Sequence, residues 1–162
     1  MNTEPLDWQA PLNQKLVRYE ALVQLFEEIQ RVDDVATIAQ RVATRWKYFA
    51  NVASWRLVVR NDPAFMIIDG ARGEASVSHA STLDHWDAHH WATQKPGLLT
   101  VSAASGGHPM PPEHLRLPGL IEIKVRPFVQ GEACIALLSV ASRHEAFNEL
   151  DNKFIHLFGN QL

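Results

Sequence analysis

The order of apolar and polar residues predicts two helices at the start of the chain. Between Leu12 and Arg31, apolar residues recur at steps of three and four, with charged residues between them. This period places them along one side of an amphipathic helix, and the stripe consists of Leu16, Tyr19, Val23, Phe26 and Ile29. The pattern breaks at VDD, where Asp33 or Asp34 is placed to cap a second helix. The expected buried stripe of that helix is Val35, Ile38, Val42 and Trp46.

After Asn51 the apolar residues alternate with polar ones, which predicts strands. In SWRLVVR, one face carries Trp55, Leu57 and Val59, and the other carries Arg56, Val58 and Arg60. The turn signal NDP follows, so AFMIID from Ala64 is the expected hairpin partner and EASVSHA a short third strand.

The second half of the chain contains three more predicted strands. They are LLTV from Leu98, IEIKVRPF from Ile121 and ACIALLSVA from Ala133. IEIKVRPF alternates, with Ile121, Ile123 and Val125 pointing inward and Glu122, Lys124 and Arg126 pointing outward. ACIALLSVA is apolar on both faces, which is typical of a central strand covered on both sides.

A helix is predicted in the middle of the chain, in LDHWDAHHWATQKPG from Leu83 to Gly97. Ser81 or Thr82 can serve as its N-cap, with Asp84 in the first turn, and Pro96 ends it. The long loop SAASGGHPMPPEHLRLPG follows the strand at Leu98. Loops of this length in compact domains are often functional.

The last predicted helix completes an α+β pattern. Asn148 is a good N-cap, and Asp151 stands at the third helical position, as in a capping box. The apolar stripe that follows is Leu150, Phe154, Leu157 and Phe158. Short turns between the strands favour an antiparallel sheet with helices packed on it, which is an α+β fold of about five to six strands.

Composition narrows the class of protein. A chain of 162 residues fits one domain, which we place at residues 12–162 behind a flexible segment at 1–11. The net charge of -3 does not favour binding to nucleic acid. The sequence shows neither an apolar run that would span a bilayer nor a signal peptide, so we expect a cytoplasmic protein or a soluble piece of a larger one. Cys134 is the only cysteine, which excludes an internal disulfide and a cysteine zinc site.

The order of elements and the C-terminal segment resemble the GAF domain family. In that family a strand ending in valine-proline-leucine, a glycine turn, an apolar strand and Phe-x-x-x-Asp lead into the last helix. Pro127, Gly131 and Phe147-x-x-x-Asp151 occupy these places here. The resemblance covers nearly all of the chain from Leu12 onward. It implies N- and C-terminal helices on one face of the sheet, and a pocket on the other face beneath the middle helix and the long loop.

Two departures from the family pattern concern its ligands. GAF domains that bind cyclic nucleotides carry an Asn-Lys pair in the strand before Phe-x-x-x-Asp, where this chain has Val140-Ala141-Ser142-Arg143. Bilin-binding members commonly carry Cys followed by His near the middle helix, where this chain has Ala88-His89. Neither cyclic nucleotide binding nor covalent bilin attachment is therefore expected, and the cofactor is unknown.

The middle helix holds the candidate ligand-binding residues, Trp86, His89, His90 and Trp91. An aromatic ring could stack on a small ligand while a histidine donates a hydrogen bond. On a helix, His85 and His89 are one turn apart, a separation that suits two metal ligands. Two ligands do not close a metal site, so we assign no metal. The alternative for Trp86 and Trp91 is simple packing in the core.

The family resemblance implies a non-catalytic sensory module of a bacterial-type signalling protein, which dimerises and precedes an output domain. We expect a homodimer through the terminal helices, with Leu22, Val23 and Leu25 of the first helix and Phe154 and Phe158 of the last as contacts. One alternative is an inert GAF-type module that only dimerises or binds a partner. A second is an enzyme that reduces free methionine sulfoxide, although a lone Cys134 cannot form the internal disulfide of that chemistry.

Overall fold

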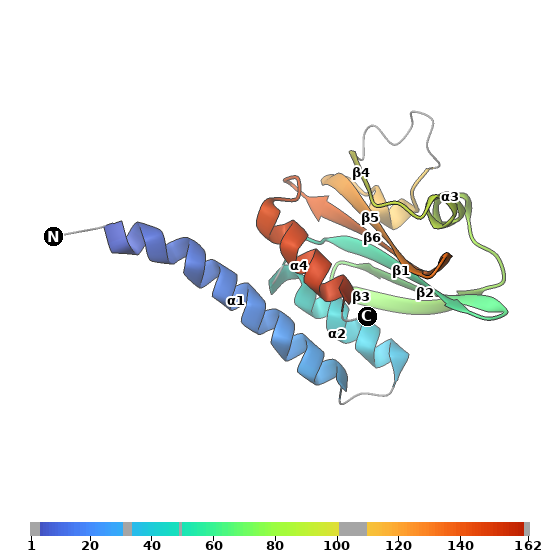
Figure 1. The fold of residues 1–162 in the computed structure, drawn as a ribbon, viewed down its shortest axis with the longest axis horizontal. Coiled ribbons are helices and arrows are strands. Elements are labelled where there is room, and N and C mark those ends of the chain that lie inside the picture. Colours follow the sequence, from blue (N-terminus) through green and yellow to red (C-terminus); the bar gives the residue numbers. More distant parts are fainter. Residues whose placement is uncertain (1–3, 31–33, 49, 101–109, 161–162) are drawn as a thin grey trace.

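Six strands form one antiparallel sheet within the residues that the computed structural model describes, which are 4–30, 34–48, 50–100 and 110–160 (Figure 1). The strands are β1 (Ser54–Asn61), β2 (Ala64–Ala71), β3 (Glu74–Ala80), β4 (Gly97–Thr100), β5 (Leu120–Gln130) and β6 (Ala133–Arg143). Their order across the sheet is β3-β2-β1-β6-β5-β4, and neighbouring strands are antiparallel. The predicted antiparallel α+β fold is confirmed.

The alternation read from the sequence sets the two faces of the sheet. Trp55 and Leu57 belong to one apolar core, and Val58, the residue after Leu57, belongs to a second core on the opposite face. The prediction that ACIALLSVA is a central strand is also confirmed, because β6 lies between β1 and β5. Leu138 of β6 contributes to the first core and Leu137 to the second.

Three α-helices and a short 3-10 helix cover the first face. These are α1 (Glu4–Gln30), α2 (Val35–Arg45), η1 (Trp46–Tyr48) and α4 (Glu149–Asn160). Trp46, Phe154 and Phe158 are almost fully buried here, and the rings of Trp46 and Phe158 lie 4.5 Å apart. Phe154 and Phe158, which the sequence suggested as dimer contacts, are therefore part of the chain's own core.

Helix α1 differs from its prediction in two ways. It begins at Glu4 and not at Leu12, so residues 4–11, which we placed in a flexible segment, are helical. The predicted stripe is also largely on the wrong side, since Leu16 and Tyr19 are 53% and 52% exposed. Among the described side chains of α1, Leu22 and Leu25 are buried, and they belong to the core that α1 shares with α2 and α4. The side chain of Ile29 lies outside the described part.

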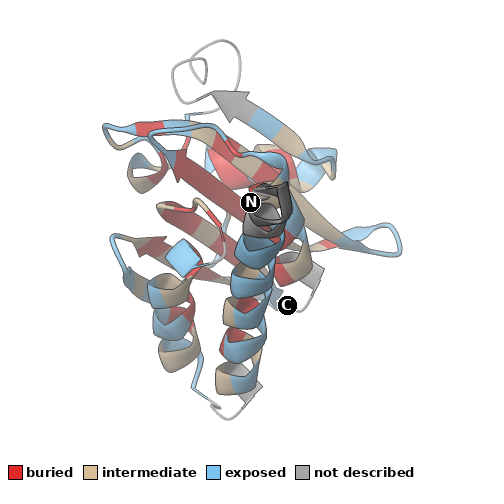
Figure 2. Cartoon of the chain, turned by 90° about the vertical axis from the view of Figure 1, so that its left-hand side faces the viewer, coloured by how far each residue is buried: buried red, intermediate tan, exposed pale blue. Residues whose placement is uncertain are grey.

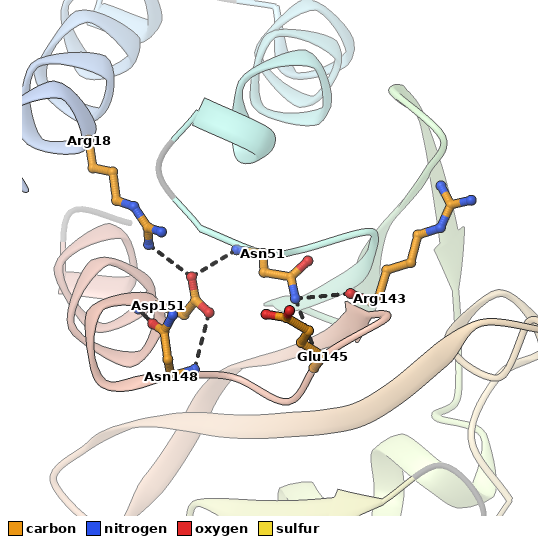
Figure 3. A network of polar contacts seen from close by, with 6 residues as sticks. All are labelled: Arg18, Asn51, Arg143, Glu145, Asn148 and Asp151. Atoms are coloured by element: carbon orange, nitrogen blue, oxygen red, sulfur yellow. Dashed lines mark hydrogen bonds and ion pairs between the residues drawn. The ribbon is translucent and has the colours of Figure 1, made fainter. Parts of the chain in front are cut away.

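Asp151 joins α1, α4 and the segment before β1 (Figure 3). Its side chain is buried, and its carboxylate accepts hydrogen bonds from the Arg18 guanidinium at 2.9 Å and from the backbone N–H groups of Asn51 and Asn148 at 3.1 Å each. The Asn148 side chain in turn accepts from the Asp151 N–H at 2.8 Å. The predicted capping box is thus confirmed, and the aspartate of the Phe-x-x-x-Asp motif connects three separate elements.

The outward-facing residues of β5 contact α4. Lys124 donates a hydrogen bond to the Asn152 side chain at 2.9 Å, and Arg126 donates one to the His156 carbonyl at 2.9 Å. The predicted inward position of Ile121 is wrong, because this residue is 40% exposed. A shift in the strand register between Leu120 and Ile123 interrupts the alternation there.

Helix α3 (His85–Thr93) and the 3-10 helix η3 (Glu113–Leu115) cover the second face. The helix cap is Asp84, whose side chain accepts from the Asp87 N–H at 2.8 Å, so the predicted caps Ser81 and Thr82 are wrong. The described part of the long loop contains η3, and its residues 102–109 lie outside the described part. Helix α3 and the terminal helices therefore lie on opposite faces, as the family resemblance implies (Figure 1).

No helix within residues 4–30, 34–48, 50–100 and 110–160 combines the length and the apolar character that a membrane span requires.

Candidate functional site

The tryptophan that begins α3 fills the space between this helix and the sheet. Trp86 is 1% exposed, and its indole N–H donates a hydrogen bond to the Ser139 hydroxyl on β6 at 3.1 Å. His90 follows one turn later and is also buried, with its ring centroid 4.3 Å from that of Trp86. These two candidate ligand residues therefore form the packed inner side of α3.

The other two candidates lie nearer to solvent. His89 is half-buried, and its ring meets that of His90 edge to face at 5.0 Å. Trp91 is also half-buried but points to a different neighbour, since its ring meets Phe65 of β2 at 5.4 Å. The structure thus brings Trp86, His89 and His90 together and places Trp91 against β2.

A cluster of charged side chains lies between α3 and the sheet. At its centre is Arg56 of β1, whose guanidinium is 3.1 Å from Asp87 and 3.3 Å from Asp84 at the start of α3. The same guanidinium is 3.6 Å from Asp69, the residue that pairs with Arg56 across β1 and β2. We call Arg56, Asp69, Asp84, Asp87 and His114 the Arg56 cluster.

His114 brings η3 into the Arg56 cluster. Its Nε2 atom is 3.2 Å from the Asp69 carboxylate and 3.0 Å from the Trp55 carbonyl oxygen. Because both neighbours are acceptors, the geometry assigns a proton to Nε2. The cluster therefore connects α3, η3, β1 and β2.

Asp87 has the most perturbed environment in the cluster. Its side chain is fully buried, and burial raises its pKa to about 7, a shift that the Arg56 charge opposes and that the negative charges of Asp84 and Asp69 increase. A carboxyl group with this pKa exchanges its proton near neutral pH. Perturbed groups of this kind concentrate at functional sites.

The sequence did not identify the Arg56 cluster. The spacing of apolar residues in the strand and in the middle helix does not distinguish Arg56 or Asp87 from the other charged residues of these elements. The sequence contained one signal, which is that Arg56 and Val58 point to the same face of their strand. Because Val58 is apolar, this face is expected to be covered, and a covered arginine requires acidic partners. Which acids supply the charge depends on how α3 crosses the sheet.

Metal binding by the histidines receives no support from the geometry. Among the described residues, no group of three or more His, Cys, Asp or Glu side chains is arranged to hold a metal ion. His85 is exposed and His89 packs against His90, so the proposed pair at one-turn spacing is not turned toward a shared point within the core.

Cys134 lies on β6, in an environment that does not activate a thiol. It is buried, and its Sγ atom donates a weak hydrogen bond to the Ala136 carbonyl at 3.3 Å. Burial raises the pKa of this thiol, which lowers the fraction of reactive thiolate at neutral pH.

Comparison with solved structures identifies the fold. The GAF domain of a phosphoenolpyruvate-protein phosphotransferase from Coxiella burnetii matches 91% of this chain and 91% of its own, with a TM-score of 0.63 at 10% identity. The GAF domain of a two-component sensor histidine kinase from Bacillus halodurans matches 81% of this chain and 92% of its own, with a TM-score of 0.58 at 13% identity.

The chain has the GAF fold. The same fold also includes an enzyme, since the free methionine-R-sulfoxide reductase from Neisseria meningitidis, solved with its substrate, matches 91% of this chain and 86% of its own. Its TM-score is 0.61 at 15% identity. No family model matches the sequence, and comparison with curated proteins gives no significant match. At these identities the likeness establishes the GAF fold, and function has to be argued from the site.

Proposed function

We propose that this chain is a non-catalytic sensory module of a signal-transduction protein, in which a small ligand binds at the half-buried side of α3 and controls an output domain. GAF domains of a sensor kinase and of a phosphotransferase are among its structural neighbours, which supports a signalling role. The observation that carries the proposal is the fully buried Asp87 carboxylate of α3, which lies 3.1 Å from the Arg56 guanidinium of β1.

The Arg56 cluster makes the position of α3 sensitive to a ligand. It contains three carboxyl groups around one guanidinium, so moving or neutralising any one of them changes the attraction between α3 and the sheet. A ligand that binds one position of α3 more tightly than another shifts the helix toward that position. His89 and Trp91 are half-buried and are the proposed direct contacts, while Trp86 and His90 support them from below.

The test is to identify small molecules that bind to this site. The protein is purified without denaturation, exposed to a library of cell metabolites and analysed by native mass spectrometry for bound mass. The wild-type chain is expected to retain a ligand that the double variant His89→Ala, Trp91→Ala loses. His79→Ala removes an exposed histidine of β3 and is expected to retain it. Absence of any bound molecule in the wild-type chain, or equal retention by all three proteins, would contradict the proposal.

The enzymatic alternative is tested separately, because the fold is shared with a methionine sulfoxide reductase. We expect no turnover of free methionine sulfoxide in the presence of a thiol reductant, since Cys134 is buried and the sequence contains no second cysteine. Turnover that disappears in Cys134→Ser would instead establish the enzyme.

We also propose that the module dimerises through α1. The exposed residues Leu12, Leu16, Tyr19 and Val23 follow one another at steps of four, three and four along this helix. This is the spacing of the apolar seam in a coiled coil. The N-terminal half of α1 projects from the sheet and its other helices, where a second helix has room to pack (Figure 1). Dimerisation through α1 is compatible with ligand binding at the half-buried side of α3, because α1 and α3 lie on opposite faces of the sheet.

A further inference from the structure

We propose that a hollow at one end of the sheet binds a small organic phosphate. The hollow has a volume of about 400 Å³ and lies between the end of α2, η1, the turn from β2 to β3, and the end of β6. Three cationic side chains line it, those of Lys47, Arg72 and Arg143, and none of its described lining residues is acidic. We call it the basic hollow.

The three cations come from separate elements whose backbones are anchored. The turn that carries Arg72 is fixed to α2 by Gln40, whose side chain donates to the Gly73 carbonyl at 2.9 Å and accepts from the Ala75 N–H at 3.1 Å. The Asn51 side chain donates to the Arg143 carbonyl at 3.1 Å and so fixes the end of β6. Lys47 lies in η1, next to a buried tryptophan. Because the backbones that carry them are held in place, only the side chains of these cations have to be ordered when a ligand binds.

No carboxylate neutralises these cations in the described part of the chain. Neither Lys47 nor Arg72 nor Arg143 is within ion-pair distance of an acidic side chain among the described residues. The nearby Asp151 is held by Arg18, and the Arg143 side chain extends away from both (Figure 3). Placing like charges around one cavity is unfavourable by itself, and an anion in the cavity offsets that cost.

The remaining lining of the basic hollow explains why the anion should have an organic part. Val52, Trp55 and Leu117 provide apolar surface beside the cations, and the volume is in the range of small-molecule sites. A phosphate group offers several oxygens that three cations can share, and the arginine guanidinium matches its geometry. A phosphate ester with an apolar body therefore satisfies both parts of the lining.

Isothermal titration calorimetry of the whole chain tests this, with phenyl phosphate as the probe and inorganic phosphate, citrate and benzyl alcohol for comparison. Phenyl phosphate is expected to bind at one site, and at least about tenfold more tightly than inorganic phosphate because its ring buries apolar surface. Benzyl alcohol, which lacks the charge, is expected not to bind. Tighter binding of citrate than of phenyl phosphate would assign the site to a polycarboxylate and overturn the proposal.

Charge-removing variants locate the binding. Arg143→Gln, and Arg72→Asn, which suits the positive φ of 55° at this residue, are each expected to weaken phenyl phosphate binding by about tenfold. Arg143→Lys keeps the charge and is expected to lose less affinity for phenyl phosphate than Arg143→Gln. Lys95→Gln removes an exposed cation elsewhere and is expected to bind as the wild-type chain does. Equal affinities across these variants, with circular dichroism confirming that each is folded, would overturn the proposal.

Discussion

Burial raises the pKa of Asp87 to about 7, so the side chain is close to half ionised at neutral pH. The main cause is loss of hydration, and the negative charges of Asp84 and Asp69 act in the same direction. Arg56 opposes them because its guanidinium favours the ionised form. At the scale of one residue, the balance between these effects determines the charge with which α3 meets the sheet.

Asp87→Asn is expected to reduce the pH dependence of stability. The folded pKa of Asp87 is about 7, above its ordinary value of 3.8, so between these values the folded state holds a proton that the unfolded state has lost. The contribution of Asp87 to the stability of the folded state is therefore greatest below about pH 4, and it is lost as the pH rises through 7. As the pH rises from about 4 to above 7, the free energy of unfolding of the wild-type chain should fall by on the order of a few kcal/mol relative to that of Asp87→Asn.

Urea unfolding at several pH values measures this difference. Glu20→Gln removes an exposed carboxyl from α1 and serves as the control. Its free energy of unfolding should change with pH as that of the wild-type chain does. Parallel stability curves for the wild-type chain and Asp87→Asn would show that Asp87 is ionised throughout the window, contrary to the expectation.

Elements are joined in this protein by single buried groups as well as by apolar packing. Asp151 accepts hydrogen bonds from α1, from the segment before β1 and from the cap of α4. Gly70 has a comparable role in packing β1 on β2, because any Cβ there would overlap the Trp55 indole. Each group serves more than one element, so its loss affects their mutual arrangement.

Asp151→Ala is expected to lower the free energy of unfolding by about 3 kcal/mol, because the Arg18 charge and two backbone N–H groups lose their acceptor. Glu149→Ala, two residues earlier and exposed, should change it by less than about 0.5 kcal/mol. Chemical denaturation of the two variants measures both values. Similar small losses in both would mean that the Asp151 contacts do not stabilise the junction of α1 and α4.

At the scale of the whole molecule, the two faces of the sheet carry different proposed roles. Helix α3 and the Arg56 cluster lie on one face, and α1, α2 and α4 lie on the other. Exposed residues run along most of the described length of α1, as Figure 2 shows. A dimer formed through α1 would leave the half-buried side of α3 open to a ligand, because α3 lies on the opposite face of the sheet.

Leu16→Glu combined with Tyr19→Glu is expected to convert the dimer to a monomer, because it places four charges in the seam of each pair of helices. Light scattering after size-exclusion chromatography measures the mass. Gln24→Glu adds a charge to α1 outside the stripe and should leave the dimer intact. A wild-type chain that is monomeric at high micromolar concentration would contradict the dimer.

Periodicity alone determined the strands, their faces apart from Ile121, the central position of β6 and the α+β class, because these depend on local spacing and on which residues exclude water. The capping box at Asn148 and Asp151 was predictable for the same reason. The cap of α3 was not, since Ser81, Thr82 and Asp84 are all good caps and the docking of Trp86 on the sheet selects among them.

Only the tertiary structure decided the contacts between residues far apart in the chain. Arg56 meets Asp87 because the packing of α3 on the sheet brings the start of this helix next to β1. Leu25 is buried in place of Leu16 because α2 and α4 pack on one particular side of α1. The basic hollow likewise exists because three chain segments that are far apart in the sequence meet at the same end of the sheet. Local patterns specify which side chains are apolar or charged, and only the packing of elements specifies which of them face one another.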